Sequence, residues 1–277
     1  LYIQEKAIEA TRAALGKATL SILTWHYGTC NLATNRDLPE KAKNRLVVGF
    51  NSEVQADNTI LVGRVTDKNG DITGTIVNYA CHPTTLAWDN PLISPDYVGA
   101  MRELVQNETH APCLFLQGAS GELAPAEQYS DNTNLAEKHG RQVGFAVLST
   151  LQSMLSPERV LAFSTIVESG APLAVWRETL GETSSILSAR IDNVLLPLKE
   201  LQTLSEIEKE YEECEDHVLK ERLSRKLNVR KAVGDGEVAP IPMWIWQLGN
   251  SFLIGQPNEA YSQFQTKLRT QFPGKAL

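Results

Sequence analysis

Two strand-like runs separated by a helical pattern occupy residues 71–127 and constrain the fold more than any other stretch. The first run, DITGTIVNYACHP, is rich in β-branched residues and ends at His82, directly before a proline. The second run, CLFLQGASGELAP, starts apolar and then breaks into a glycine-containing loop. Between them, LISPDYVGAMRELVQ has helical periodicity, with Ser94 or Asp96 as the expected N-cap. The pattern predicts a strand–helix–strand unit of an α/β protein, in which ligands bind beyond the carboxyl ends of the strands.

The other segments alternate between strand-like and helical patterns. DKNG at residues 67–70 and the pair Gly249-Asn250 are typical of hairpin turns. Residues 197–234 are highly charged, with apolar residues three and four positions apart, which predicts a long helix or a helical hairpin. We expect an α/β fold, with a mixed β-sheet flanked by helices in one domain, residues 1–277, that carries residues 197–234 as a charged helical insertion. Further helices are expected at residues 1–16, 135–155 and from Asn258 onward, and further strands at 18–28, 46–66 (two strands), 159–175 and 243–257.

Composition and charge exclude several classes of protein. The net charge of −7 and the pI near 5.4 argue against nucleic acid or an anionic membrane surface as the main partner. No apolar run approaches the roughly 20 residues that a transmembrane segment needs. The four cysteines include no CxxC pair, which predicts buried thiols rather than a zinc finger or a disulfide framework. The helical pattern begins at the first residue, and the final FPGKAL resembles a turn entering a strand, so we expect a fragment of a longer protein.

Four residues are candidates for chemistry, and each also has a purely structural interpretation. His82, at the end of a strand, is either a packed histidine or a ligand. Arg36, in a loop after a strand, is either a solvated charge or a clamp for an anion or carbonyl. Glu259 is either a glutamate in the first turn of a helix or a metal-binding carboxylate. GASGE invites a nucleophilic Ser120, but the G-x-S-x-G pattern fails because Glu122 replaces its last glycine.

Four motifs, taken in order, resemble the catalytic domain of the neutral/alkaline non-lysosomal ceramidases: NYACHPTTL, LISPDYVG, LFLQGASGELAP and LGNSFLIGQPNEAYSQF. The resemblance implies one zinc ion, Zn2+, held by two histidines, a glutamate and a tyrosine, with a water that attacks an amide carbonyl. By motif position, His82 matches the second zinc histidine and Glu259 the zinc glutamate. Arg36, in ATNRDLP, matches an arginine of the family's NRS segment that lines the active site, which implies a catalytic role. A small-molecule or lipid substrate, a role in sphingolipid metabolism and an extracellular or periplasmic location are also implied.

The sequence departs from the family pattern in three places. The family's first zinc histidine and its neighbouring acid/base histidine belong to a segment upstream of this chain. Its zinc tyrosine lies downstream, beyond Leu277, and Tyr261 is too close to Glu259 to replace it. Ala124 stands where the family has a serine just before the proline. The departures leave two hypotheses: a zinc-dependent amidohydrolase that cleaves a ceramide-like N-acyl or related acyl bond, or a non-catalytic relative that binds a lipid or glycan. A third hypothesis is a metal-free serine hydrolase that uses Ser120 and His82. No oligomeric state is indicated.

Overall fold

The computed structural model describes residues 2–277, which divide into two compact units. The first unit contains the residues up to Ser184 together with Glu259–Ala276, and the second contains Ser185–Asn258 and Leu277. The expected helical insertion at 197–234 lies inside the second unit. Both units combine helices with strands, so the α/β class predicted from the sequence is confirmed. None of the helices in residues 2–277 is long and apolar enough to cross a membrane.

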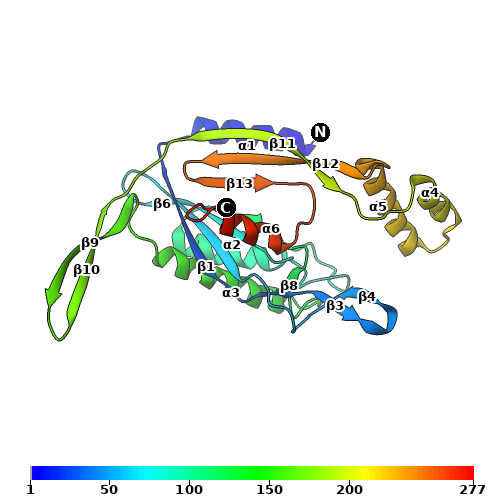
Figure 1. Ribbon diagram of the computed structural model, residues 1–277, viewed down its shortest axis with the longest axis horizontal. Coiled ribbons are helices and arrows are strands. Elements are labelled where there is room, and N and C mark those ends of the chain that lie inside the picture. Colours follow the sequence, from blue (N-terminus) through cyan, green and yellow to red (C-terminus); the bar gives the residue numbers. More distant parts are fainter. Residues whose placement is uncertain (1) are drawn as a thin grey trace. The chain divides into compact units, whose positions relative to one another are not determined.

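A four-stranded mixed sheet forms the centre of the first unit (Figure 1). Its strand order is β1-β5-β6-β7, in which β5 pairs antiparallel with β1 and β6, whereas β7 runs parallel to β6. The parallel pair is joined by helix α2, as residues 71–127 predict. The predicted DKNG turn joins β5 to β6, with the Asp67 carboxylate accepting the amides of Asn69 and Asp71. The bounds of these elements are β1 Ile22–Thr29, β5 Thr59–Thr66, β6 Ile72–Tyr79, α2 Asp96–Thr109 and β7 Cys113–Gln117.

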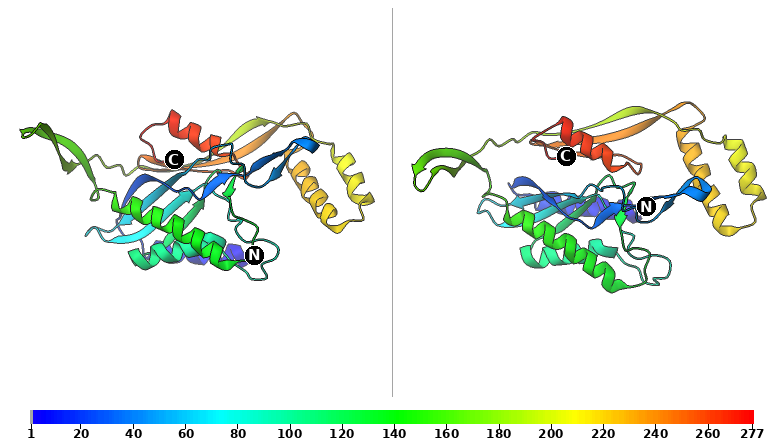
Figure 2. Two further views of the ribbon diagram at one scale, coloured as in Figure 1. Left: turned by 90° about the horizontal axis from the view of Figure 1, so that it is seen from below. Right: turned by 60° about the horizontal axis from the view of Figure 1, so that its bottom comes forward.

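The core lies between this sheet and two helices, α2 and α3 (Thr133–Gln152), which pack together along one of its faces (Figure 2). Two buried tyrosines are part of it, and their hydroxyl groups donate to backbone carbonyls. Tyr79 donates to Cys30 at 2.8 Å, and Tyr97 donates to Cys81 at 2.6 Å. Because burial of such a side chain contributes about 2 kcal/mol and its hydroxyl is satisfied, both tyrosines stabilise the core and fix the loops that follow β1 and β6.

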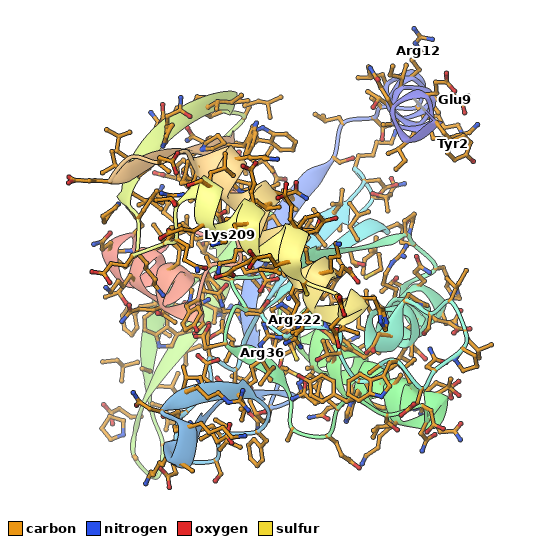
Figure 3. All side chains as sticks on the ribbon, turned by 90° about the vertical axis from the view of Figure 1, so that its right-hand side faces the viewer. Tyr2, Glu9, Arg12, Arg36, Lys209 and Arg222 are labelled. Carbon is orange, nitrogen blue, oxygen red and sulfur yellow. The ribbon has the colours of Figure 1, made fainter. Side chains whose placement is uncertain are left out.

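The first unit has further helices and strands besides those that form this core. Helix α1 has no buried residue, and Tyr2, Glu9 and Arg12 project from it in different directions (Figure 3). The two strands expected within 46–66 are present, but they do not pair, because β4 pairs with β3 instead of β5. The predicted N-cap of α2 is wrong: Pro95 occupies that position, and the Ser94 hydroxyl accepts the Asp96 amide instead. The bounds are α1 Tyr2–Gly16, β2 Ala33–Asn35, β3 Asp37–Glu40, β4 Arg45–Val48, β8 Leu123–Pro125, β9 Arg159–Glu168, β10 Pro172–Leu180 and α6 Ser262–Gln271.

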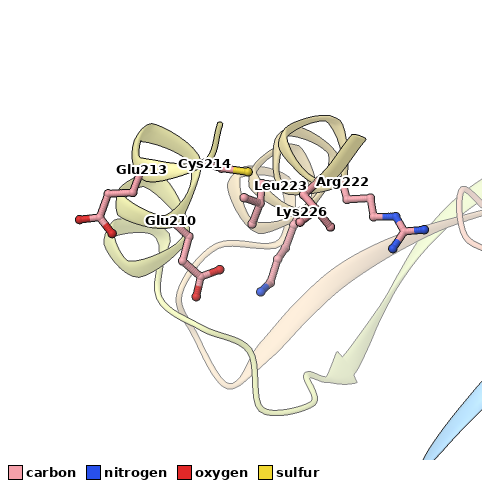
Figure 4. A pocket seen from close by; sticks show the side chains of 7 residues that line it. Glu210, Glu213, Cys214, Arg222, Leu223 and Lys226 are labelled. Atoms are coloured by element: carbon pink, nitrogen blue, oxygen red, sulfur yellow. The ribbon is translucent and has the colours of Figure 1, made fainter. Parts of the chain in front are cut away.

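The second unit is a three-stranded antiparallel sheet, β11-β12-β13, with a helical hairpin inserted between its first two strands. The hairpin confirms the prediction for residues 197–234. Thr203 forms a capping box with Glu206 at the start of α4, and Asp216 caps α5. An open cavity of about 520 Å³ lies between the two helices (Figure 4). The bounds are β11 Leu187–Pro197, α4 Leu204–Glu213, α5 His217–Val233, β12 Val238–Leu248 and β13 Ser251–Gly255.

Candidate functional site

The candidate site forms where β6 and β7 end side by side. Tyr79 pairs with Gln117 in the parallel register, so the residues after each strand emerge at the same edge of the sheet. The loop after β7, residues 118–122, then lies against the segment that leads to His82. At Gly118 a Cβ atom would stand 2.9 Å from the Ala80 amide nitrogen, so this approach needs a glycine. The His82 amide donates to the Leu123 carbonyl at 2.9 Å, which fixes the backbone under the imidazole ring.

The imidazole ring of His82 is held through one of its two nitrogens. Nδ1 lies 2.7 Å from the Ser120 carbonyl oxygen and 3.1 Å from that of Leu123. Because carbonyl oxygens only accept hydrogen bonds, this network assigns the proton to Nδ1. Nε2 therefore carries the lone pair, which can accept a hydrogen bond or bind a metal ion, and the latter arrangement is found at metal-binding histidines. The side chain is 19% exposed.

Arg36, between β2 and β3, crosses the same loop. Its Nε and Nη2 atoms both donate to the Gly121 carbonyl, at 3.1 and 2.8 Å, and its amide donates to the Glu122 carbonyl at 2.8 Å. Nη2 also lies 3.5 Å from His82 Nε2. The side chain is only 14% exposed, so the interpretation of Arg36 as a freely solvated charge does not hold.

Glu259 lies in the loop ahead of α6 and not in its first turn. Helix α6 begins at Ser262, so the expected helix start at Asn258 and Glu259 is wrong. The N-terminus of this helix is occupied by another acid: both carboxylate oxygens of Glu122 accept the Ser262 amide, at 3.0 and 2.9 Å, and one also accepts its hydroxyl. The carboxylate of Glu259, 74% exposed, reaches back instead to His82 Nε2 at 3.7 Å and Arg36 Nη2 at 3.6 Å.

The loop also contains the serine that suggested a nucleophile. Ser120 is 4% exposed, and its hydroxyl accepts the Gln117 side-chain amide at 2.7 Å. His82 bonds to the carbonyl of Ser120 and not to its hydroxyl. The structure therefore lacks the serine–histidine pair that the third hypothesis requires. Ala124, in β8 opposite Thr34 of β2, is completely buried.

Three residues of the site have roles that the sequence did not reveal: Glu122, Tyr261 and Asp37. The Tyr261 hydroxyl donates to the Asp37 carboxylate at 2.7 Å, and this hydrogen bond raises the pKa of Tyr261. These contacts join residues more than a hundred positions apart, so no local pattern indicates them. Burial raises the pKa of the neighbouring Cys81 thiol.

His82 and Glu259 supply two kinds of donor that bind zinc in proteins, an imidazole nitrogen and a carboxylate oxygen. Two ligands on a tetrahedral zinc, each about 2.1 Å from the metal, stand about 3.4 Å apart. The 3.7 Å separation of Nε2 and the Glu259 oxygen is close to that value. Within residues 2–277, no group of three or more His, Cys, Asp or Glu side chains is placed to hold a metal ion. The described chain thus offers two neighbouring donors that fit part of a zinc site.

The fold and this cluster define an α/β protein with imidazole, carboxylate and guanidinium groups at the carboxyl edge of a mixed sheet. Solved ceramidase structures share the fold. A neutral ceramidase from Pseudomonas aeruginosa matches 95% of this chain with a TM-score of 0.59 and 17% sequence identity, and a ceramidase complexed with C2 matches 94% with a TM-score of 0.58 and 16% identity. This chain covers 44% and 45% of those two chains. No protein-family model and no curated protein sequence matches it.

Proposed function

We propose that this chain forms part of a zinc-dependent hydrolase that cleaves an amide, such as a ceramide-like N-acyl bond, or a related acyl bond. The observation that carries the proposal is the meeting of His82 Nε2 and the Glu259 carboxylate at 3.7 Å, with Nδ1 of the same ring fixed by backbone carbonyls. The fold shared with neutral ceramidases supports it. The hydrolytic activity is part of what we propose for the whole protein, because this chain spans less than half of those structures.

The three site residues have distinct roles in this proposal. A bound zinc ion supplies Lewis acidity and lowers the pKa of a coordinated water toward about 7. His82 and Glu259 would hold the ion, and the carbonyl acceptors at Nδ1 orient the imidazole ring so that Nε2 could face it. Arg36 stabilises negative charge that develops on the substrate oxygen, an effect of about 3 kcal/mol for one well-placed donor. It moves no proton, because a guanidinium stays charged at neutral pH.

The same likeness to ceramidases supports a proposal for the substrate and for the location of the protein. We propose a lipid or another small molecule with an N-acyl group, as in sphingolipid metabolism, and a protein that works outside the cytoplasm, in the extracellular or periplasmic space. The net charge of −7 favours such a substrate over nucleic acid.

The alternative is a non-catalytic relative that binds a lipid or glycan, and Ala124 is the observation that favours it. This residue is completely buried in β8, at the position where the resemblance expects a serine. A methyl group cannot donate or accept a hydrogen bond there. A relative without that hydroxyl could keep the zinc and bind a lipid without cleaving it.

The proposal is tested by measuring the zinc content of the full-length protein. We expect about one zinc per chain, which is lost in His82→Ala and in Glu259→Ala because each variant removes a ligand. His217→Ala, in the exposed first turn of α5, is the matched control and should keep its zinc. Protein that purifies without zinc and hydrolyses no N-acyl substrate would refute the proposal. Zinc-containing protein that binds the lipid without cleaving it would favour the alternative.

A further inference from the structure

Within residues 2–277, the Glu259 side chain forms no hydrogen bond that would fix its position. Its carboxylate is 74% exposed, and its distances to Arg36 and His82, 3.6 and 3.7 Å, exceed those of hydrogen bonds. Yet two ligands of one metal ion must be held within a few tenths of an ångström of the required geometry. The position of Glu259 therefore depends on how the backbone on either side of it is held, and the segment that follows it belongs to the first unit.

That segment is fastened at two points within the first unit. The Gly121 amide donates to the Ala260 carbonyl at 2.9 Å, and the Tyr261 hydroxyl donates to the Asp37 carboxylate at 2.7 Å. The ring of Tyr261 also covers Gly121, since a Cβ there would stand 2.6 Å from Cδ1 of the ring. The carbonyl of Gly121 accepts both donors of Arg36. Tyr261 thus connects the Glu259 segment to the residue that holds the guanidinium.

The acceptor of this hydrogen bond is itself fixed. Asp37 directly follows Arg36, its amide donates to the Asn35 side chain at 3.0 Å, and its carbonyl accepts the Asn51 side-chain amide at 2.9 Å. Both asparagines are 7% exposed. A hydrogen bond from Tyr261 to this anchor therefore restrains the Glu259 segment against a rigid part of the site.

We infer that Tyr261 is a positioning residue, whose hydrogen bond to Asp37 holds Glu259 at the distance from His82 that a shared metal ion requires. The inference rests on the proposed function in treating Glu259 as a zinc ligand. Tyr261 touches neither metal nor substrate in this role. It acts through the segment 259–261, and it differs from a residue that only stabilises the fold because it sets the separation of two ligands.

Tyr261→Phe tests the inference, because it removes the hydroxyl and keeps the ring over Gly121. We expect amide hydrogen exchange at Gly121 to become about tenfold faster, since a hydrogen bond to a charged acceptor is lost at a half-exposed site. The Ser262 amide should change little, because Glu122 holds it. Tyr27→Phe is the matched control: its hydroxyl donates to the Lys275 carbonyl at 3.3 Å, so its loss should leave Gly121 unchanged.

Zinc affinity separates a positioning role from a structural one. Tyr261→Phe should weaken zinc binding about tenfold, and it should have no further effect when combined with Glu259→Gln. Unchanged exchange at Gly121 overturns the inference, and so does faster exchange with unchanged zinc affinity. Wild-type protein that binds no zinc refutes the proposed function, and exchange at Gly121 then decides by itself whether Tyr261 holds the segment.

Discussion

The ion pair between Asp57 and Arg269 gives the sharpest prediction about what holds the site together. Asp57 lies in the loop before β5, and its side chain is 7% exposed. One carboxylate oxygen accepts the Thr59 amide at 3.1 Å, and the other accepts Gln265 at 2.6 Å together with Arg269, both from α6. Gln265 in turn accepts the Ala119 amide at 3.0 Å. The Asp57 carboxylate therefore anchors α6, and through Gln265 it supports the loop of the candidate site.

We predict that Asp57→Asn lowers the free energy of unfolding by about 3 kcal/mol at pH 7. Removing one partner of a buried ion pair costs about 3–5 kcal/mol, because the remaining charge is left uncompensated. The Arg269 side chain stays 18% exposed, so water compensates part of its charge and the lower end of that range applies. The carboxamide oxygen still accepts one hydrogen bond, but it attracts the guanidinium far less than a carboxylate does.

The effect should depend on pH in a definite direction. Burial raises the pKa of Asp57, but the hydrogen bonds from Arg269, Thr59 and Gln265 and the charge of Arg269 lower it more, so the folded pKa lies below the ordinary value. The stabilisation is therefore complete above the unfolded pKa of about 3.9 and is lost as the pH falls through the folded value. Asparagine does not titrate, so the difference between wild type and variant should shrink below about pH 4.

Urea unfolding followed by tryptophan fluorescence at pH 7, 5 and 3.5 measures both quantities. Asp89→Asn is the control, because Asp89 is an exposed carboxyl in the same unit and its loss should change stability by less than about 0.5 kcal/mol. A loss below about 1 kcal/mol for Asp57→Asn at pH 7 would refute the assignment of Asp57 as the anchor. A loss of the same size at all three pH values would show that charge is not its source.

Two further substitutions test the packing around the site. Tyr97→Phe should cost about 1–2 kcal/mol in the free energy of unfolding, because the fully buried hydroxyl that donates to the Cys81 carbonyl at 2.6 Å is lost; a thermal melt within 1 °C of wild type would contradict this. Gly121→Ala should cost about 2 kcal/mol, because the new methyl group would stand 2.6 Å from the Tyr261 ring and 2.9 Å from the Glu259 carbonyl. For this variant, urea unfolding unchanged from wild type would show that the loop can shift freely.

Local periodicity was enough to predict most of the fold. The strand–helix–strand unit, the turn at 67–70 and the helical hairpin within 197–234 all depend on residues close together in the chain, and all are present. The start of α6 was mispredicted because Asn258 and Glu259 have the composition of an N-cap, whereas Glu122 supplies the anionic partner from across the unit. The strands β2 and β8 have three residues each, too short to produce a periodic pattern.

The site itself was less predictable from its residues alone. Only the order of short motifs suggested that Arg36, His82 and Glu259 belong together, since nothing in the spacing of these residues implies contact. The structure brings them within 3.7 Å, while their roles as catalytic residue and zinc ligands remain predictions. GASGE suggested a nucleophile because it contains a serine between glycines. Whether Ser120 can act depends on what its hydroxyl contacts, and that contact is visible only in three dimensions.

The loop at residues 118–122 shows how such a site can persist while its sequence changes. Its contacts to the functional side chains are made by the backbone: the Ser120 carbonyl holds His82, and the Gly121 carbonyl holds Arg36. Every residue has a backbone carbonyl, whatever its side chain. These contacts therefore constrain the backbone path of the loop and not its amino-acid sequence. The side chain is restricted where a Cβ would collide, as at Gly121, or where the side chain itself makes a contact, as at Glu122. Backbone contacts of this kind help to explain how a chain with 17% identity to a neutral ceramidase keeps the same fold.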